Sequence, residues 1–585
     1  MPTGIPSVSA SAIRRALRDR AEIGLLDVRQ EGRFAAGHPL FAASFPLGRL
    51  EAEVLDRLPR RSVPLVVYGD GPGPGDDAAT AVRRLRSLGY RDVSLLAGGL
   101  AGWTSAGGEL FADVNAPSKA FGELVAATAG TPQLAAQDLQ AMLSDGQDVV
   151  VVDARRFEEY QTMSIPTATS VPGAELVLRV GALAPDPATT VVVNCAGRTR
   201  SIIGAQSLIN AGQGNRVMAL RNGTIGWTLA GLTLEAGHAR RGPEVPAASA
   251  RQARARAWAV ADKAGVRRIG SRELRSLADG ARRTVYRFDV RTPEEYVAGH
   301  PAGFRPAPGG QLVQETDWFA PVRGALIVLA EDDGGRAAMT GSWLAQMGWD
   351  VTVWTPGPAG PVEKGSWTPA LPPLPEVTLA DPAQVDGWLR AGEALVVDVD
   401  TSRRFLAGHV PGAAWALRTD LSGGTVHGLL HRYPGTTRLV LTSADGILAA
   451  FAAADLPEPA GAVVAVLDGG TAGWAGSGRP LQAGPGEMLS PPVDVYRRPY
   501  EGTDVDPEAM QAYLDWEHGL VAQLERDGTH GFTVLTVPPG NGGSAPDRPG
   551  DPALYKILPV DIIDNMTLRS TRAGRPPSPT WPLTG

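Results

Sequence analysis

One pattern occurs four times along the 585 residues, and this internal repeat restricts the fold more than any other feature of the sequence. Each copy contains a short apolar run that ends in an aspartate: Asp27, Asp153, Asp289 and Asp398. A second apolar run follows, then a stretch with helical periodicity, and each copy closes with a Gly/Trp signal. Short β-branched runs that alternate with helical patterns are typical of parallel sheets. We therefore expect an α/β chain in which each copy is a small parallel sheet flanked by helices.

The spacing of the copies, about 110–140 residues, is that of a whole domain and not of a solenoid unit. We number the copies one to four in chain order and expect domains at residues 4–115, 129–240, 262–370 and 376–484. Changes in composition predict separators between them at residues 116–132, 238–258 and 369–377.

Residues 485–585 follow the last copy and are predicted to form a partly irregular C-terminal extension. It contains one predicted amphipathic helix between Asp506 and Gly528, with Asp506 as its N-cap. The Gly- and Pro-rich stretches 538–552 and 571–585 are expected to be irregular.

Charge and composition exclude several classes of protein. The net charge is −7 with both signs interspersed, so we expect no nucleic-acid partner. The first residues lack the apolar core of a secretory signal, and no run is long enough to span a membrane, so no membrane partner is expected. A single cysteine cannot form an intramolecular disulfide and fits a reducing, cytoplasmic setting.

The most informative segment surrounds that cysteine and reads VVVNCAGRTRSIIGAQSLINAG. Its apolar run 191–193 predicts a buried strand, and residues 202–211 predict a helix with Ser201 as its N-cap. Cys195 thus begins a loop between a strand end and a helix start. Amide groups of such a loop and the helix N-terminus attract anions, and they lower a thiol pKa from its usual value of about 8.5. Arg198 and Arg200 are expected to add positive charge, whereas the alternative is a buried structural thiol.

Cys195-x-x-x-x-Arg200-Ser201, preceded by Asp153-Ala-Arg155 and followed by Gly226-Trp227, resembles the rhodanese-like sulfurtransferase family. The resemblance covers residues 4–484 as four tandem copies and is strongest in copy two. It implies that Cys195 is a persulfide carrier and that Asp153 and Arg155 support the site structurally. The loop that would bind the anionic sulfur consists of Ala196, Gly197, Arg198, Thr199 and Arg200, followed by Ser201.

The resemblance implies double displacement between a small anionic sulfur donor and a thiol, cyanide or protein acceptor. The six-residue loop is one residue shorter than that of the related dual-specificity phosphatases, which favours attack on sulfur over phosphorus. Its basic character favours thiosulfate over mercaptopyruvate, because two anionic charges suit Arg198 and Arg200. Mercaptopyruvate sulfurtransferase, sulfur relay to a protein partner and a scaffold with a vestigial cysteine stay as alternatives.

The other copies lack the nucleophile. The position of Cys195 is taken by Gly69 in copy one, Glu331 in copy three and Ser443 in copy four, while Arg336 matches Arg200. We expect these copies to be inert towards sulfur, acting as scaffold or as recognition modules. No cofactor is expected, and one cysteine with 8 scattered histidines predicts no metal site. Homodimer formation is left open.

Overall fold

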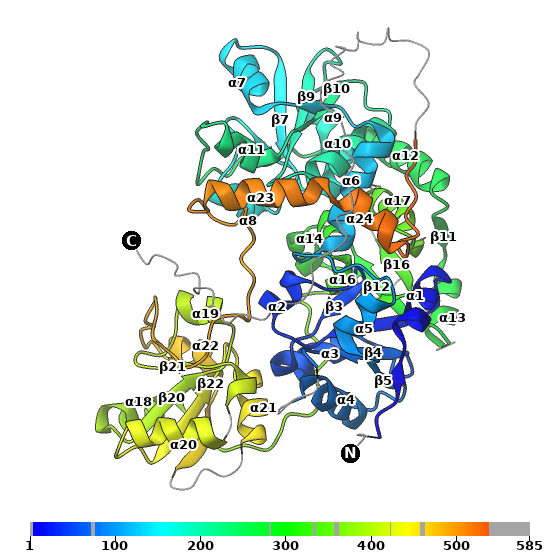
Figure 1. The fold of residues 1–585 in the computed structure, drawn as a ribbon. Coiled ribbons are helices and arrows are strands. Elements are labelled where there is room, and N and C mark those ends of the chain that lie inside the picture. Colours follow the sequence, from blue (N-terminus) through cyan, green and yellow to red (C-terminus); the bar gives the residue numbers. More distant parts are fainter. Residues whose placement is uncertain are drawn as a thin grey trace, which may run out of the picture. The chain divides into compact units, whose positions relative to one another are not determined.

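The computed structural model describes residues 4–71, 76–279, 282–330, 335–355, 362–421, 423–456 and 462–536. Within these ranges the four copies each contain a sheet of parallel strands flanked by helices (Figure 1). In copy two the strand order is β6-β10-β9-β7-β8, from Gln133–Leu134, Arg216–Leu220, Thr190–Asn194, Val149–Asp153 and Thr169–Ser170. Its helices are α7 (Ala136–Ser144), α8 (Phe157–Thr162), α9 (Leu176–Leu183), α10 (Thr199–Asn210) and α11 (Gly223–Leu229).

The same strand order recurs in the other copies. Copy one contains β1 (Ser7–Val8), β2 (Ile23–Asp27), β3 (Ala42–Ser44), β4 (Leu65–Tyr68) and β5 (Val93–Leu96). Copy three contains β11 (Arg267–Ile269), β12 (Val285–Asp289), β14 (Arg305–Pro306), β16 (Leu326–Ala330) and β17 (Asp350–Trp354). Copy four contains β19 (Leu379–Ala380), β20 (Ala394–Asp398), β21 (Ala414–Trp415), β22 (Arg438–Thr442) and β23 (Val463–Leu467).

Helices cover these three sheets in the same alternation with the strands. Copy one has α1 (Ala10–Arg18), α2 (Glu31–Ala36), α3 (Leu50–Arg57), α4 (Asp77–Ser87) and α5 (Gly99–Ser105). Copy three has α13 (Ser271–Asp279), α14 (Pro293–Ala298), α15 (Gly309–Gln314), α16 (Thr316–Phe319) and α17 (Arg336–Gln346). Copy four has α18 (Pro382–Ala391), α19 (Ser402–Ala407), α20 (Gly423–Arg432), α21 (Ile447–Asp455) and α22 (Gly470–Gly476). The predicted α/β class is therefore confirmed.

Four short strands depart from the repeat. β15 (Val322–Arg323) of copy three pairs antiparallel with β2 of copy one, so these copies share a sheet edge. β24 (Glu487–Met488) comes from the C-terminal extension and pairs with β21 of copy four. β18 (Val362–Glu363) pairs with β13 (His300–Pro301) inside copy three. Copy four consequently receives a strand from beyond residue 484, where the sequence pattern ends.

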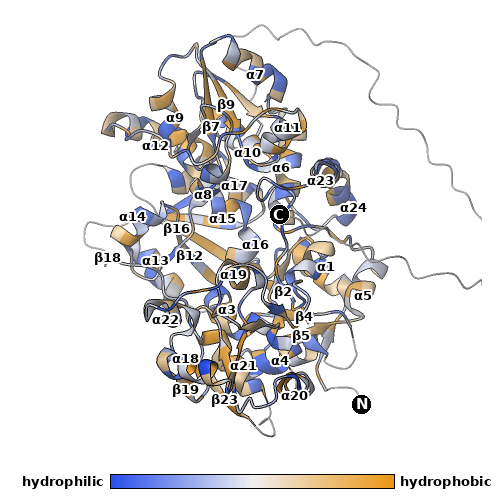
Figure 2. Ribbon diagram, turned by 90° about the vertical axis from the view of Figure 1, so that its left-hand side faces the viewer, coloured by the Kyte–Doolittle hydropathy of each residue, from blue (hydrophilic) through white to orange (hydrophobic). Residues whose placement is uncertain are grey.

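The four aspartates that define the repeat end the strands β2, β7, β12 and β20. In the first three copies the carboxylate binds the arginine two residues later, as in the 2.8 Å ion pair between Asp153 and Arg155. Copy four has Asp400 in place of that arginine, and burial raises the pKa of Asp398 to about 7. Figure 2 shows hydrophobic residues along the central strands, as expected for sheets covered on both faces.

Two predicted separators are helices rather than loops. α6 (Ala116–Ala129) occupies the first, and α12 (Ala247–Lys263) begins inside the second. α6 is largely buried and α12 buries one face, because both contribute to a hydrophobic core shared by copies one, two and three. Copy four has separate core clusters. Phe121 of α6 lies edge-on to Trp343 of α17 and to Phe532 of the extension. The two separators predicted at 116–132 and 238–258 therefore contain helices that belong to the shared core.

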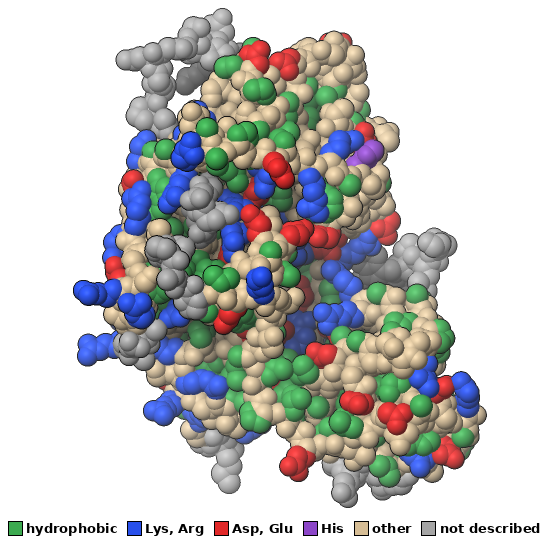
Figure 3. All heavy atoms as spheres, turned by 180° about the vertical axis from the view of Figure 1, so that it is seen from behind, with side chains coloured by type: hydrophobic (Ala, Val, Ile, Leu, Met, Phe, Trp, Pro, Cys, Tyr) green, Lys and Arg blue, Asp and Glu red, His purple; other side chains and the backbone are tan. Residues whose placement is uncertain are grey.

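The extension forms two helices where the sequence predicts one. α23 (Pro507–His518) and α24 (Leu520–Asp527) meet at Gly519, and the Asp506 side chain caps α23 as predicted. The stretches 538–552 and 571–585 lie outside the described residues. Among the described helices, none combines the length and apolarity needed to cross a membrane. Basic and acidic side chains are intermixed on the face seen in Figure 3.

Phe121 gives a direct test of the shared core. We expect Phe121→Ala to lower the free energy of unfolding by about 3–5 kcal/mol, because it removes a fully buried ring that contacts two other segments. Urea unfolding followed by tryptophan fluorescence measures this, with Phe157→Ala as the control because the Phe157 ring is only half-buried. Equal losses in the two variants would contradict a core that spans the copies.

Candidate active site

The cysteine lies where the sequence places it, directly after the buried strand β9. The helix α10, however, begins at Thr199 and not after Ser201. Ser201 is therefore no N-cap; its hydroxyl donates to the Arg198 carbonyl over 2.8 Å, and the Cys195 thiol points to the Ser201 oxygen over 3.5 Å. The first turn of α10 thus brings the Ser201 side chain to the sulfur.

The neighbouring helix α11 holds the outer side of the loop. Its first-turn amides, those of Thr224 and Ile225, donate to the carbonyls of Cys195 and Ala196 over 2.9 and 3.0 Å. Gly223 precedes them with φ of +54°, and a Cβ there would lie 2.3 Å from the Cys195 carbonyl oxygen. Only glycine fits this approach.

Asp153 and Arg155 stabilise the backbone around the loop and do not contact the sulfur. The Asp153 carboxylate accepts one hydrogen bond from Arg155 and another from the side-chain amide of Asn194, each over 2.9 Å. Arg155 in turn donates to the Met163 carbonyl over 2.5 Å. This placement agrees with the supporting role that the family resemblance implies.

Both loop arginines are held by carboxylates. Arg198 forms a bidentate pair with Glu123 of α6, at 2.6 and 2.8 Å, and donates to Asn222 over 3.1 Å. Arg200 pairs with Glu159 of α8 at 2.7 and 2.8 Å. Although burial acts in the opposite direction, Arg200 lowers the pKa of Glu159 to about 2. The expected excess of positive charge is therefore largely neutralised in this structure.

Burial disfavours the thiolate form of Cys195 in this conformation. Cys195 is 2% exposed, and burial raises its pKa, although the Arg200 guanidinium and the Ser201 hydroxyl act in the opposite direction. The expectation of a lowered pKa was wrong for this state, because desolvation penalises the thiolate more than its neighbours favour it.

The cover over the loop is the C-terminal extension. Figure 1 shows α23 next to α6 and α11, and its apolar residues form one cluster with the loop and α11: Ala196, Ile225, Tyr500, Met510, Tyr513 and Leu514. A Cβ on Gly197 would lie 3.1 Å from the Tyr513 ring. A reagent that reaches Cys195 from this side therefore has to pass between α23 and the loop.

The cover is anchored by a buried lysine. Lys119 of α6 forms a 2.9 Å ion pair with Asp113, and its ammonium group lies 5.1–5.5 Å from the ring centroids of Tyr500, Tyr513 and Trp516. Cation–π contacts of this kind are strongest when water is excluded. They tie the extension to the helix that also carries Glu123.

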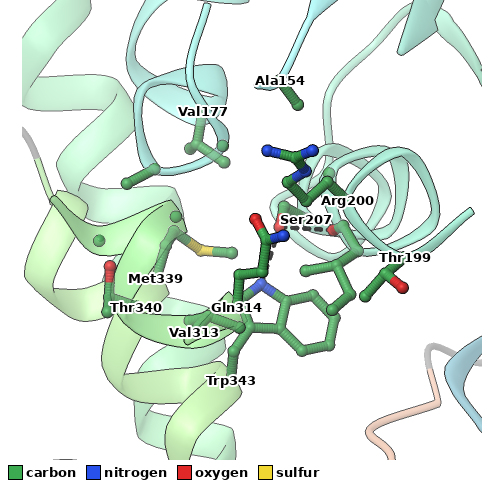
Figure 4. Close-up of a pocket in the computed structure, with 16 residues that line it drawn as sticks. Ala154, Val177, Thr199, Arg200, Ser207, Val313, Gln314, Met339, Thr340 and Trp343 are labelled. Atoms are coloured by element: carbon green, nitrogen blue, oxygen red, sulfur yellow. Dashed lines mark hydrogen bonds between the residues drawn. The ribbon is translucent and has the colours of Figure 1, made fainter. Parts of the chain in front are cut away.

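A separate cavity of about 40 Å³ lies behind α10, between copies two and three (Figure 4). Apolar side chains dominate its lining, and the Arg200 side chain reaches it, but Cys195 does not line it. The volume suits one or two water molecules, so this cavity is no substrate site. It lies at the contact where Arg336 of copy three binds Glu175 of copy two over 2.8 Å.

The strand-end positions of the other copies match the alignment made from the sequence. Gly69 follows β4 and Ser443 follows β22, as Cys195 follows β9, while Glu331 lies outside the described residues. In copy four, the Asp400 carboxylate accepts from the Ala444 amide over 2.7 Å. A loop amide of copy four is thus already bound to an anionic group of the chain itself.

The model of the Rhodanese-like domain family matches residues 9–106, 135–230 and 381–477. The chain is also 32% identical over 104 residues to a sulfurtransferase of Allochromatium vinosum, covering 94% of that protein and 18% of this chain. The chain belongs to the rhodanese-like sulfurtransferase family. Copy three lies outside the matched residues, but its sheet has the same strand order.

One solved structure resembles this sulfurtransferase over almost its whole length. The crystal structure of thiosulfate sulfurtransferase from Pseudomonas aeruginosa matches with a TM-score of 0.87 and 55% identity, covering 91% of this chain and 100% of that chain. An HTH-type transcriptional regulator of Mycobacterium tuberculosis is 36% identical over 90 residues, covering 15% of this chain and 39% of the regulator. The chain therefore spans less than half of that regulator.

Sequence reasoning missed four residues at the site: Glu123, Glu159, Asn222 and Glu517. Glu159 had a signal, since copies two and three both carry a glutamate six residues after the repeat aspartate and 41 residues before the loop arginine. In the described part of the chain, no three His, Cys, Asp or Glu side chains group as metal ligands.

We expect Leu514→Ala to expose the thiol. Leu514 is a fully buried residue of α23, so its truncation weakens the docking of this helix on the loop. The fraction of molecules with an accessible thiol should then increase at least about tenfold. The rate of Cys195 alkylation by iodoacetamide measures this, and the chain has no other cysteine to interfere. Gln511→Ala, at an exposed position of the same helix, is the control. Identical rates in both variants and in the wild type would show that α23 does not limit access.

Proposed function

We propose that copy two is a thiosulfate-type sulfurtransferase that carries sulfur as a persulfide on Cys195. The thiolate attacks the outer sulfur of the donor, a new S–S bond forms, and sulfite leaves with the electron pair of the broken bond. An acceptor thiolate or cyanide then attacks the persulfide sulfur and releases the Cys195 thiolate. The position of Cys195 between β9 and the N-terminus of α10 is the observation that carries this proposal.

The loop supplies the remaining requirements of the reaction. The amides of residues 196–201 and the N-terminus of α10 stabilise an anionic sulfur, with Arg200 adjacent. Asp153 and Arg155 keep the strand end in place. No step needs a metal or organic cofactor. The loop is too short for the phosphatase alternative, which expects one more residue.

Thiosulfate is the favoured donor among the alternatives. The related P. aeruginosa protein is named for that activity, and its match extends over the whole of that chain. A small acceptor is favoured over a protein acceptor, because α23 covers the loop that a protein would have to contact. Mercaptopyruvate as donor and relay to a protein remain the alternatives. Because the thiol must stay free, we place the reaction in a reducing, cytoplasmic compartment.

We propose that the other copies are inert towards sulfur and shape copy two. Copy one offers Gly69 and copy four offers Ser443 at the nucleophile position, and the Asp400 carboxylate already binds an amide of the copy-four loop. Copy three instead contributes Arg336, which binds Glu175 beside α10. The domain limits 4–115, 129–240, 262–370 and 376–484 belong to this proposal.

Cys195→Ser should abolish transfer of sulfur from thiosulfate to cyanide, because serine cannot form the persulfide. Thiocyanate formation measures the reaction, and Ser443→Ala in copy four should leave it unchanged. Residual turnover in Cys195→Ser would place the chemistry elsewhere in the chain. A wild-type protein without turnover on thiosulfate would overturn the choice of donor.

A further inference from the structure

Glu517 is the least expected residue near the catalytic loop. It lies on the buried face of α23, where Met510, Tyr513 and Leu514 form an apolar stripe at helical spacing and Glu517 continues it. The Glu517 side chain is 0% exposed. Burying a carboxyl group costs free energy that a leucine at the same position would not require.

The Glu517 carboxyl group faces the loop directly. Its Oε1 accepts from the Tyr513 hydroxyl over 2.8 Å and lies 3.5 Å from the Thr199 hydroxyl. Its Oε2 points towards Gly197, where a Cβ would lie 3.3 Å away. Among the described residues, Oε2 has no hydrogen-bond partner. One oxygen therefore remains for a group that enters between α23 and the loop.

The charged neighbours of Glu517 are already paired with other groups. On α6, Lys119 is bound to Asp113, and on the loop Arg198 is bound to Glu123. These pairs leave Glu517 without a counter-charge of its own. Burial raises its pKa to about 8, although Lys119 acts in the opposite direction, so the group is mostly protonated at neutral pH.

We propose that Glu517 is a specificity-determining residue that selects the charge of reagents reaching Cys195. In its protonated form it donates its O–H to an anionic group placed above Gly197. In its ionised form it repels such a group. The identification of the selected reagent as an anionic sulfur donor rests on the proposed function. The selection by charge does not depend on it.

Other groups that face this space behave differently as the pH rises. Tyr500 and Tyr513 have pKa values raised by burial, so they stay neutral. The pKa values of Arg198 and Arg200 are raised, so they stay charged. Burial lowers the pKa of Lys119, and its deprotonation would also weaken the attraction for anions. The test therefore has to separate Glu517 from Lys119.

The test compares alkylation of Cys195 by anionic iodoacetate and by neutral iodoacetamide between about pH 6 and pH 10. The ratio of the two rate constants cancels the ionisation of Cys195 and the loosening of α23, because both reagents pass between α23 and the loop to the same thiolate. In the wild type we expect the ratio to fall about tenfold as the pH rises through the pKa of Glu517. In Glu517→Gln the ratio should stay high through this range.

Glu508→Gln, exposed on the same helix, is the matched control and should behave as the wild type. A fall that persists unchanged in Glu517→Gln would overturn the proposal and assign the effect to Lys119. A wild-type ratio that does not change with pH would overturn it without any variant. The iodoacetamide rate alone shows whether Glu517→Gln disturbs the docking of α23. Loss of thiosulfate turnover with the expected ratios intact would contradict only the proposed function.

Discussion

The two hydrogen bonds from the first turn of α11 to the carbonyls of Cys195 and Ala196 fix the loop on which the site depends. Peptide groups are planar and trans, so carbonyls that face α11 turn the following amides to the opposite side. The N-terminus of α10 approaches the sulfur from the other direction. Gly223 makes this possible, since any Cβ at that position would collide with the Cys195 carbonyl. In the proposed reaction, the loop therefore binds an anion through its backbone geometry more than through its arginines.

Burial and charge compensation explain why the pKa of the Cys195 thiol is raised in this conformation. Glu123 and Glu159 each neutralise a loop arginine, and the cover of α23 removes water from the sulfur. Desolvation then dominates the pKa of Cys195. Movement of α23 would restore water while leaving the backbone amides in place, which couples access for the donor to activation of the nucleophile. The C-terminal extension is thus part of the copy-two site although it follows copy four in the chain.

Much of this arrangement could be predicted from local patterns. The strand end before Cys195, the Asp153–Arg155 brace and the Asp506 cap each depend on residues close together in sequence. A comparison between copies two and three could have identified Glu159. Glu517 could have been noticed as a polar residue in the apolar stripe of α23. The pairing of Arg198 with Glu123 was not predictable, because it depends on how α6 packs against α10. The raised pKa of the thiol also depends on that tertiary packing, and an anion-binding loop alone predicted the opposite direction.

In the proposed function, one thiol under a helical cover carries sulfur for the whole chain. Mass spectrometry of the intact protein and of its peptides after incubation with thiosulfate tests this, with sulfite release measured in parallel. We expect a gain of one sulfur atom on the peptide containing Cys195, one equivalent of sulfite per chain, and loss of the added sulfur on treatment with cyanide. Sulfite release without added sulfur on Cys195, or no reaction after the cover is loosened, would contradict it.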